Sequence, residues 1–348
     1  MAEKTKIQWT SHTFNPWRGC SKVNDGCTNC YAEKEAKRFP KNRGIWGPNG
    51  TRVKAAAATW AEPLKWNAMA QAAGERRRVF CASLADVFEE WDGRIHDHEG
   101  RILHRCASCG SNWAEGEAVP CECGRDHPVN WLTMNEMRRD LFALIDRTPW
   151  LDWQLVTKRP ERVYACWPPV IYRNDKGTEI FVGPASERKT SFLHRPNAWV
   201  LTSVSDQKTY DAFKPRLLQL RALAAVLGVS VEPMLAPIHF GDLAGIDWLI
   251  FGGESGPHAR PCNLGWIRDG LEQCADGNVA GFMKQAGAFP LVSIDDEVLT
   301  EWALSREHLQ HAHVIEVYLR DSKGGDLAEL PASLAVRQFP TMREAVLS

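Results

Sequence analysis

Short β-rich runs alternate with stretches of helical spacing over most of the chain, and this alternation limits the folds open to it. The runs fall at residues 79–81, 153–156, 199–201, 225–231, 248–251 and 279–283. Between the first two, Thr133 and Glu136 have the spacing of a capping box and apolar residues follow at helical spacing, which predicts a helix from about Thr133 to Arg147. Strands that alternate with helices predict an α/β fold of repeated βα units around a parallel sheet or barrel.

Polar or flexible residues follow each predicted strand. In chain order they are Ser83 and Asp86, then Thr157, Lys158 and Arg159, then Ser203, Ser205 and Asp206, then Glu232, then Gly252, Gly253 and Glu254, and lastly Lys284 and Gln285. The carboxyl ends of parallel strands meet at one rim, where βα barrels carry their active sites. We therefore expect a shared pocket at this rim, lined by the catalytic candidates Glu232, Glu254 and Lys284. Each residue taken singly is equally compatible with an ordinary turn or cap.

The chain has eleven cysteines among 348 residues, and the rest of its composition directs attention to them. Its net charge is −1, so no overall basic field indicates nucleic-acid binding. The first residues contain no apolar run of the kind a secretory signal needs, and no run of about eighteen apolar residues predicts a membrane span. We expect a soluble cytoplasmic protein with no membrane partner. Because the cytosol keeps thiols reduced, clustered cysteines there indicate metal ligands before disulfides.

Cys20, Cys27 and Cys30 form the first cluster, with the spacing C-x6-C-x2-C, and the third cysteine opens a helical pattern. Thiolates bind iron strongly, and a helix N-terminus stabilises negative charge. Three cysteines leave one iron of a [4Fe-4S] cluster open for an external ligand, whereas four would saturate it. The alternatives are a zinc site completed by a histidine such as His12, or a loop of buried cysteines.

Six further segments accompany this motif. They are FNPWRGC at residues 14–20, LVTKRPE at 155–161, SVEPML at 230–235, FGGESGPHARP at 251–261, MKQAG at 283–287 and KGGD at 323–326. Together they resemble an uncharacterised radical S-adenosylmethionine (SAM) family that is frequent in bacteriophages and prophages. The resemblance runs from about residue 8 to residue 340 with one interruption. The common radical SAM spacing is C-x3-C-x2-C, so the first gap is longer here.

The resemblance implies a partial (β/α) barrel of radical SAM type over residues 1–92 and 131–290, followed by a C-terminal extension at 291–348. It also implies that Cys20, Cys27 and Cys30 hold the [4Fe-4S] cluster and that the backbone around Tyr31 contacts the adenine of SAM. Further expected contacts to SAM come from Ser83, Lys158, Ser203, Ser205, Asp206, Gly252 and Gly253. Superfamily members often place a Gly-Gly-Glu motif after the second strand, but here it comes several units later. Glu254 therefore contacts SAM, holds substrate or caps a turn.

The interruption is an insert at residues 93–130 that contains the second cysteine cluster. Its members are Cys106, Cys109, Cys121 and Cys123, and Gly110 and Gly124 follow the two pairs. A glycine after each pair is typical of a metal knuckle, because the tight turn needs a residue that tolerates positive φ. We expect a small zinc ribbon with structural Zn²⁺, in which His104 or His127 is an alternative ligand. A second iron-sulfur cluster and unliganded cysteines are the other interpretations.

These features lead to the hypothesis of a radical SAM enzyme. In such an enzyme the cluster cleaves SAM reductively to a 5′-deoxyadenosyl radical, which abstracts hydrogen from the substrate. Its partners would be SAM, a reductant such as flavodoxin or ferredoxin, and a DNA or nucleotide substrate, with a hypermodified pyrimidine base as the target. A peptide or small metabolite is an alternative substrate. The alternative from another class is a nucleic-acid-binding module in which zinc and iron-sulfur sites are both structural.

Overall fold

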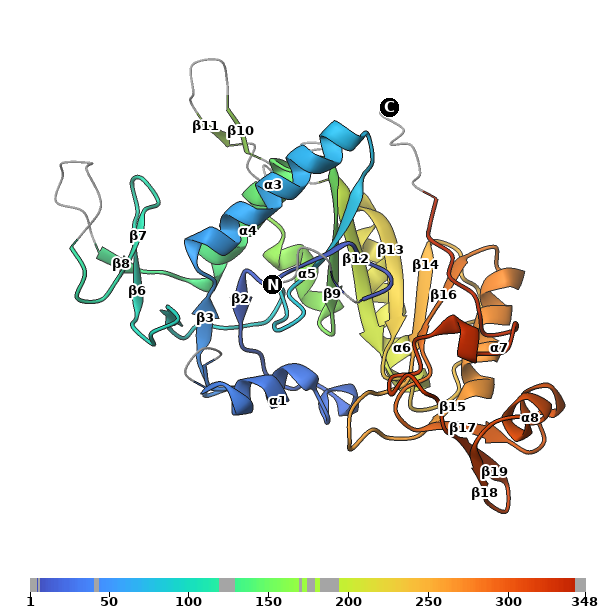
Figure 1. Ribbon diagram of the computed structural model, residues 1–348. Helices are drawn as coiled ribbons and strands as arrows, with labels where there is room; N and C mark the ends of the chain where they lie inside the picture. The colour runs from blue at the N-terminus through green and yellow to red at the C-terminus, as the bar shows by residue number, and fades with distance from the viewer. Residues whose placement is uncertain are drawn as a thin grey trace. The chain divides into compact units, whose positions relative to one another are not determined.

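The computed structural model describes residues 5, 7–40, 44–118, 129–168, 171–173, 179–181 and 194–341, and Figure 1 labels their helices and strands. The chain divides into two compact units. The first unit comprises Met1–Val23 and Cys30–Ala198, and the second comprises Asn24–Asn29 and Trp199–Ser348. The short segment Asn24–Asn29, which contains Cys27, therefore belongs to the second unit, although the chain on both sides of it belongs to the first.

Seven strands form an open, curled parallel sheet in the order β1-β4-β9-β12-β13-β14-β16 (Figure 1). Their bounds are His12–Phe14 (β1), Arg77–Cys81 (β4), Leu151–Thr157 (β9), Arg195–Val204 (β12), Ala224–Val231 (β13), Trp248–Gly252 (β14) and Ala280–Gln285 (β16). All six predicted strands are confirmed, and β1 is additional. The fold is mixed α/β, and its sheet has the half-barrel form that agrees with the predicted partial barrel.

The described part of the first unit contains several helices. They are α1 (Tyr31–Arg38), α3 (Ala57–Ala73), α4 (Met134–Asp146) and α5 (Pro160–Cys166). Helix α3 packs against β4 and β9, and its Trp66 stacks on His12 of β1 with ring centroids 4.4 Å apart. Both Thr133 and Glu136 make the predicted reciprocal capping contacts at the start of α4. The predicted helix is therefore confirmed to within a residue at each end.

Two small sheets also belong to the first unit. Strands β2 (Trp17–Arg18), β3 (Arg52–Lys54) and β5 (Ile95–His96) form one, and β6 (Leu103–Cys106), β7 (Asn112–Ala114) and β8 (Val129–Trp131) form the other. Strand β5 lies inside the predicted insert, yet it pairs in parallel with β3. A further hairpin joins β10 (Ile171–Arg173) to β11 (Glu179–Phe181). The first residues of the insert are thus part of a sheet that begins earlier in the chain.

The second unit contains α6 (Gln207–Leu218), α7 (Leu264–Asp276) and α8 (Glu297–Leu304). Helix α7 packs against β14 and β16, and at Gly270 an added Cβ would lie 2.5 Å from the Phe251 ring. A four-stranded sheet is formed by β15 (Cys262–Asn263), β17 (Pro290–Ser293), β19 (Val314–Val317) and β18 (His308–Gln310). The backbone N–H of Met283 donates to Val336 (2.7 Å), so the C-terminal extension continues along β16.

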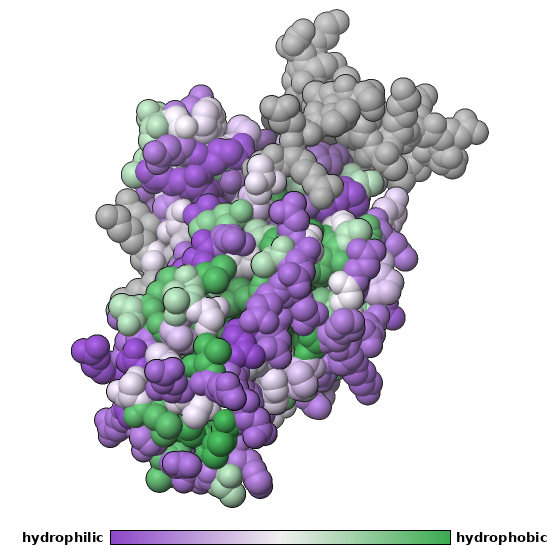
Figure 2. Space-filling view, turned by 90° about the vertical axis from the view of Figure 1, so that its right-hand side faces the viewer, coloured by the Kyte–Doolittle hydropathy of each residue, from purple (hydrophilic) through white to green (hydrophobic). Residues whose placement is uncertain are grey.

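Hydrophobic residues on the face drawn in Figure 2 form several separate groups among hydrophilic ones. The large apolar side chains that remain exposed come from distant parts of the sequence, from Val23 to Tyr318. Within the described residues, no helix has both the length and the apolar character required to cross a membrane.

Candidate functional site

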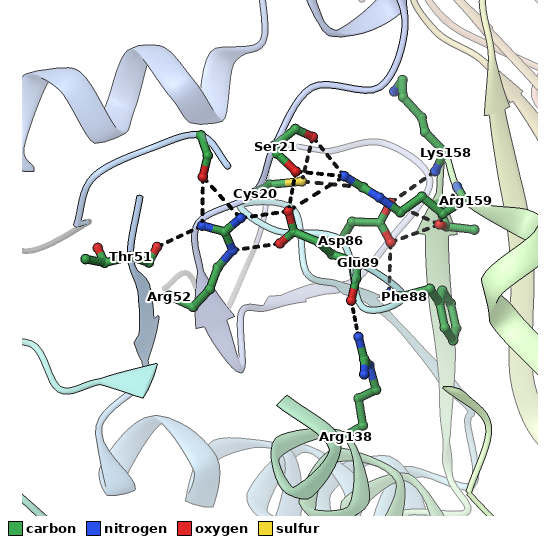
Figure 3. Close-up of polar contacts among 12 residues, drawn as sticks. Cys20, Ser21, Thr51, Arg52, Asp86, Phe88, Glu89, Arg138, Lys158 and Arg159 are labelled. Atoms are coloured by element: carbon green, nitrogen blue, oxygen red, sulfur yellow. Dashed lines mark hydrogen bonds and ion pairs between the residues drawn. The ribbon is translucent and has the colours of Figure 1, made fainter. Parts of the chain in front are cut away.

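The carboxylate of Asp86 links the carboxyl ends of β4 and β9 (Figure 3). It accepts hydrogen bonds from the Thr157 hydroxyl (2.9 and 3.0 Å) and from Arg159 Nη1 (2.9 Å). The backbone N–H groups of Phe88 (2.9 Å) and Lys158 (3.2 Å) also donate to it. Asp86 is buried, so these donors replace the water that an isolated carboxylate would require.

Arg159 extends this network to Cys20. Its Nη1 lies 3.7 Å from Cys20 Sγ, and its Nη2 donates to the backbone oxygen (2.9 Å) and hydroxyl (3.2 Å) of Ser21. Burial, together with the carboxylates of Glu89 and Asp86, raises the pKa of the Cys20 thiol to about 12, although Arg159 acts in the opposite direction. Arg159 is thus the cation nearest to the first cysteine among the contacts drawn in Figure 3.

A second buried ion pair supports the same loop. Glu89 accepts from Arg52 through Nε (2.6 Å) and Nη2 (2.7 Å), and the side chains are 1% and 0% exposed. The Ser21 hydroxyl donates to Glu89 Oε1 at 2.6 Å, and Arg138 donates to the Glu89 backbone oxygen. Gly19, just before Cys20, has φ +105°, and a Cβ there would lie 2.4 Å from a backbone oxygen of Thr51. The loop conformation therefore requires glycine at this position.

Neither Arg52 nor Glu89 was among the predicted site residues. They are 37 residues apart, and neither directly follows a predicted strand. The sequence offers no local signal for such a pair, because a buried charge is recognised only when its partner is known. Asp86 and Arg159 were noted as polar residues after strands, but their shared contact to the cysteine loop was not predicted.

The other two cysteines of the first cluster lie on short elements. Cys27 ends a 3-10 turn, η1 (Asp25–Cys27), in the second unit, and Cys30 is the N-cap of α1 in the first. The Cys30 side chain makes no capping hydrogen bond. Both cysteines are half-buried and outside any disulfide. The start of α1 at Cys30 is as the sequence predicted.

Tyr31 and Ser83, both predicted to contact SAM, lie together in the first unit. The Tyr31 hydroxyl donates to the Ser83 backbone oxygen at 2.5 Å. Asn15 holds the same turn, because its side chain donates to the Ser83 hydroxyl (3.1 Å) and accepts from the Leu84 N–H (2.8 Å). Ala82, at the end of β4, has φ +61°, which a non-glycine residue rarely adopts. Such local strain occurs often at functional sites.

Among the residues that the structure describes, no three His, Cys, Asp or Glu side chains converge as a metal site. The chemistry of the first cysteine set nevertheless fits an iron-sulfur cluster. Cys20, Cys27 and Cys30 are free thiols on one short segment, the Arg159 guanidinium lies beside the first sulfur, and a helix begins at the third. A cation and a helix N-terminus both favour thiolate charge.

The first half of the predicted zinc site is a tight turn between β6 and β7. The Gly110 N–H donates to the Cys106 oxygen (2.9 Å), and Gly110 has φ +76°, as a metal knuckle requires. Cys106 is buried and Cys109 is exposed. The His104 ring lies 4.6 Å from the ring of Trp131. The remaining predicted positions lie outside the described residues: Cys121, Cys123, Gly124 and His127.

In the second unit, the structure brings Glu232 and Lys284 together as an ion pair. Lys284 Nζ lies 2.5 Å from Glu232 Oε1, with side chains 23% and 15% exposed. The Ser230 hydroxyl donates to Glu232 Oε2 (3.0 Å), and the Ser203 hydroxyl donates to the Glu232 backbone oxygen (3.1 Å). An added Cβ at Gly252 would lie 2.9 Å from Glu232 Oε1, so this glycine leaves room for the pair.

Glu254, the third catalytic candidate, has different partners. Arg260 donates to it from Nη2 (2.8 Å), Nε (3.1 Å) and its backbone N–H (2.9 Å), and Asn29 Nδ2 donates at 2.9 Å. Burial raises the pKa of Glu254, but these hydrogen bonds and the Arg260 charge outweigh burial and hold it below its usual range. At Gly253 a Cβ would lie 2.2 Å from the Ala286 oxygen, so contact with the neighbouring backbone accounts for this glycine.

The remaining predicted SAM contacts have local structural tasks. Asp206 caps α6 by accepting from the Thr209 N–H at 2.8 Å, and the Ser205 N–H donates to the Thr209 hydroxyl at 3.0 Å. Lys158 binds Asp86 through its backbone, and its side chain points away from that carboxylate in Figure 3. These contacts agree with the interpretation of such residues as caps and turns.

The fold and the cysteine loop define a mixed α/β protein with a half-barrel parallel sheet and three thiols after its first strand. The chain belongs to the family described as "Protein of unknown function (DUF5131)", whose model matches residues 4–107 and 110–318. The match thus continues through the predicted insert apart from two residues. No curated protein and no solved structure matches the chain.

Replacement of Glu89 by glutamine tests the buried network. Glu89→Gln removes the charge that pairs with Arg52, and breaking a buried pair should lower the free energy of unfolding by about 3 kcal/mol. The matched control is Glu90→Gln, because Glu90 is 77% exposed and forms an ion pair with Arg162 at the surface. In Glu90→Gln we expect the free energy of unfolding to fall by less than about 0.5 kcal/mol. Urea unfolding measures the free energy of unfolding of both variants. Equal losses in the two variants would contradict the role of Glu89 in the buried ion pair.

Proposed function

We propose that this protein is a radical SAM enzyme in which Cys20, Cys27 and Cys30 hold a [4Fe-4S] cluster. The observation that carries the proposal is the cysteine loop after β1, with three free thiols and the Arg159 guanidinium 3.7 Å from the first sulfur. When bound, the cluster would supply the electron that cleaves SAM reductively, and a flavodoxin or ferredoxin would supply the electron to the cluster.

The protein's own residues would hold the cysteine loop and keep water from it. Arg159 and Glu89 both bind Ser21, so the residue after Cys20 is held by two oppositely charged side chains. The positive charge of Arg159 would offset thiolate charge at Cys20. The turn at Ser83, bonded to Tyr31, would accept the adenosine end of SAM, and Ser203 and Ser205 are the proposed contacts for its ribose.

Glu232 and Lys284 are the proposed substrate contacts. A carboxylate can orient an amine or hydroxyl, and a lysine can bind a phosphate or carboxylate as a point charge. Their ion pair at 2.5 Å is half-buried, which limits competition from water. A pyrimidine base in DNA or in a nucleotide offers both kinds of partner. A peptide or small metabolite remains the alternative.

The insert supports a nucleic-acid substrate over a small metabolite. Arg94 lies over the exposed ring of Trp131, with its guanidinium carbon 4.1 Å from the ring centroid. Arginine and aromatic side chains of this kind stack on bases and contact phosphates. Structural zinc in the insert would rigidify this surface. The same features support the alternative function, a nucleic-acid-binding module with structural metal sites.

Loss of any one cluster thiol should abolish both the iron site and SAM cleavage. In Cys20→Ala, Cys27→Ala and Cys30→Ala we expect no bound cluster after anaerobic reconstitution, against about four irons in the wild type. Cys166→Ala is the matched control, because Cys166 is half-buried and lies outside the cluster motif. Iron analysis and detection of 5′-deoxyadenosine measure the outcome. SAM cleavage by a variant that lacks all three thiols would refute the proposal.

The insert should bind zinc independently of the cluster. We expect about one zinc per chain, a count that follows from four cysteine ligands at Cys106, Cys109, Cys121 and Cys123. Cys109→Ala should lower zinc content without lowering reconstituted iron, and Cys274→Ala should change neither. Elemental analysis distinguishes the metals. A second iron-sulfur spectrum that persists after loss of Cys20 would instead make the insert an auxiliary cluster site.

Lys284→Ala should separate substrate turnover from SAM cleavage. Removal of the ammonium misplaces the substrate relative to the reacting carbon, so we expect retained iron and retained SAM cleavage with loss of modified product. The exposed Lys208 provides the control Lys208→Ala, which should keep bound iron, SAM cleavage and modified product. The assay is anaerobic incubation with phage or host nucleic acid, followed by mass spectrometry of nucleosides. Product formation equal to wild type in Lys284→Ala would exclude the proposed contact.

A further inference from the structure

The loop after β14 contacts the segment that carries Cys27. We propose that Glu254 and Arg260 are positioning residues that hold Asn24–Asn29 so that Cys27 can act as a cluster ligand. The role in cluster binding rests on the proposed function, whereas the contacts themselves do not. The proposal gives the late Gly-Gly-Glu motif a task that differs from contact with SAM or substrate.

Three contacts within the second unit join these two parts of the chain. Asn29 Nδ2 donates to Glu254 Oε2 (2.9 Å) and to the His258 backbone oxygen (2.8 Å). Arg260 Nη1 donates to the Asp25 backbone oxygen at 2.9 Å. The partners are 225, 229 and 235 residues apart in sequence. The segment Asn24–Asn29 accordingly belongs to the second unit.

The contacts lie on both sides of Cys27, at Asp25 and Asn29. The segment between them is a turn with its own hydrogen bonds, because the Asn24 side chain accepts from the Gly26 N–H (3.1 Å) and the Cys27 N–H donates to the Asn24 oxygen (2.9 Å). A turn that is closed internally and held at both ends places Cys27 with little freedom. Arg260 and Asn29 therefore hold the backbone on both sides of Cys27.

The carboxylate of Glu254 has little capacity left for another ligand. An ionised carboxylate offers about four lone pairs, and four donors surround this one, three from Arg260 and one from Asn29. Glu254 is also only 8% exposed. Glu232 differs from Glu254 in this respect, because Glu232 pairs with the flexible ammonium of Lys284. Glu254 is thus suited to hold a loop.

A carboxylate exchange between positions 254 and 29 tests the proposal. In Glu254→Gln the amide keeps one oxygen for the four donors of Arg260 and Asn29 and turns an N–H group toward the rest, so the contact weakens. Adding Asn29→Asp restores a carboxylate to the cluster of donors and gives the amide an acceptor, but it removes the contact to the His258 backbone oxygen, so the rescue is partial. A double-mutant cycle of this kind isolates the pairwise interaction from other effects of each substitution.

The readout is the alkylation rate of Cys27 in the cluster-free protein, measured by peptide mass spectrometry, together with the iron content after reconstitution. We expect Glu254→Gln to speed alkylation about tenfold, since charged hydrogen bonds are lost, and to lower iron content. Adding Asn29→Asp should return both values toward wild type. The matched control is Asp247→Asn, which alters a carboxylate that Arg221 contacts at 2.6 Å in the same unit. It should change neither value.

The outcomes separate this proposal from the proposed function. Unchanged alkylation of Cys27 in Glu254→Gln, or an Asp247→Asn effect of the same size, overturns the positioning role whether or not iron binds. Faster alkylation with undiminished iron content also overturns it. A wild-type protein that binds no iron overturns the proposed function, while the alkylation cycle still reports whether Glu254 and Arg260 hold the Cys27 segment.

Discussion

The ion pair between Asp86 and Arg159 is the interaction on which the first unit's cysteine loop depends. Both side chains are buried and lie 2.9 Å apart, and the same guanidinium reaches Cys20 and Ser21. A buried charge without a partner is strongly unfavourable, so the two strand ends and the loop must come together for either residue to be accommodated. Arg52 of β3 and Glu89 form a second buried ion pair, so β3 must also come together with this loop.

In each unit, a carboxylate that follows a strand contacts an arginine, and this contact helps to hold part of the cysteine motif. In the first unit Asp86 follows β4 and acts on Cys20 through Arg159. In the second unit Glu254 follows β14 and acts on the Cys27 segment through Asn29 and Arg260. Buried, directional hydrogen bonds specify geometry more narrowly than apolar packing does, which would suit residues that present thiols to the proposed cluster.

The Glu232 and Lys284 pair differs from these contacts in a way that bears on function. Glu232 follows β13 and Lys284 lies near the end of β16, with β14 between these strands in the sheet, and lysine is a compact charge on a flexible stem. Such a pair can exchange its internal contact for a ligand at low cost. The proposed substrate site rests on this difference between charges that hold the backbone and charges that can meet a substrate, whereas the cysteine loop carries the proposed activity.

The sequence alone determined the elements whose signals are local. The β-rich runs predicted six strands, and Thr133 with Glu136 predicted the start of α4, because strand and capping propensities act over a few neighbouring residues. The first strand, β1, was missed because three residues carry too little pattern. Tertiary structure alone decided the roles of the charged residues. Glu232 and Glu254 both follow strands and look alike in sequence, yet one meets Lys284 and the other meets Arg260 and Asn29, because distant donors reach them only after the sheet has formed.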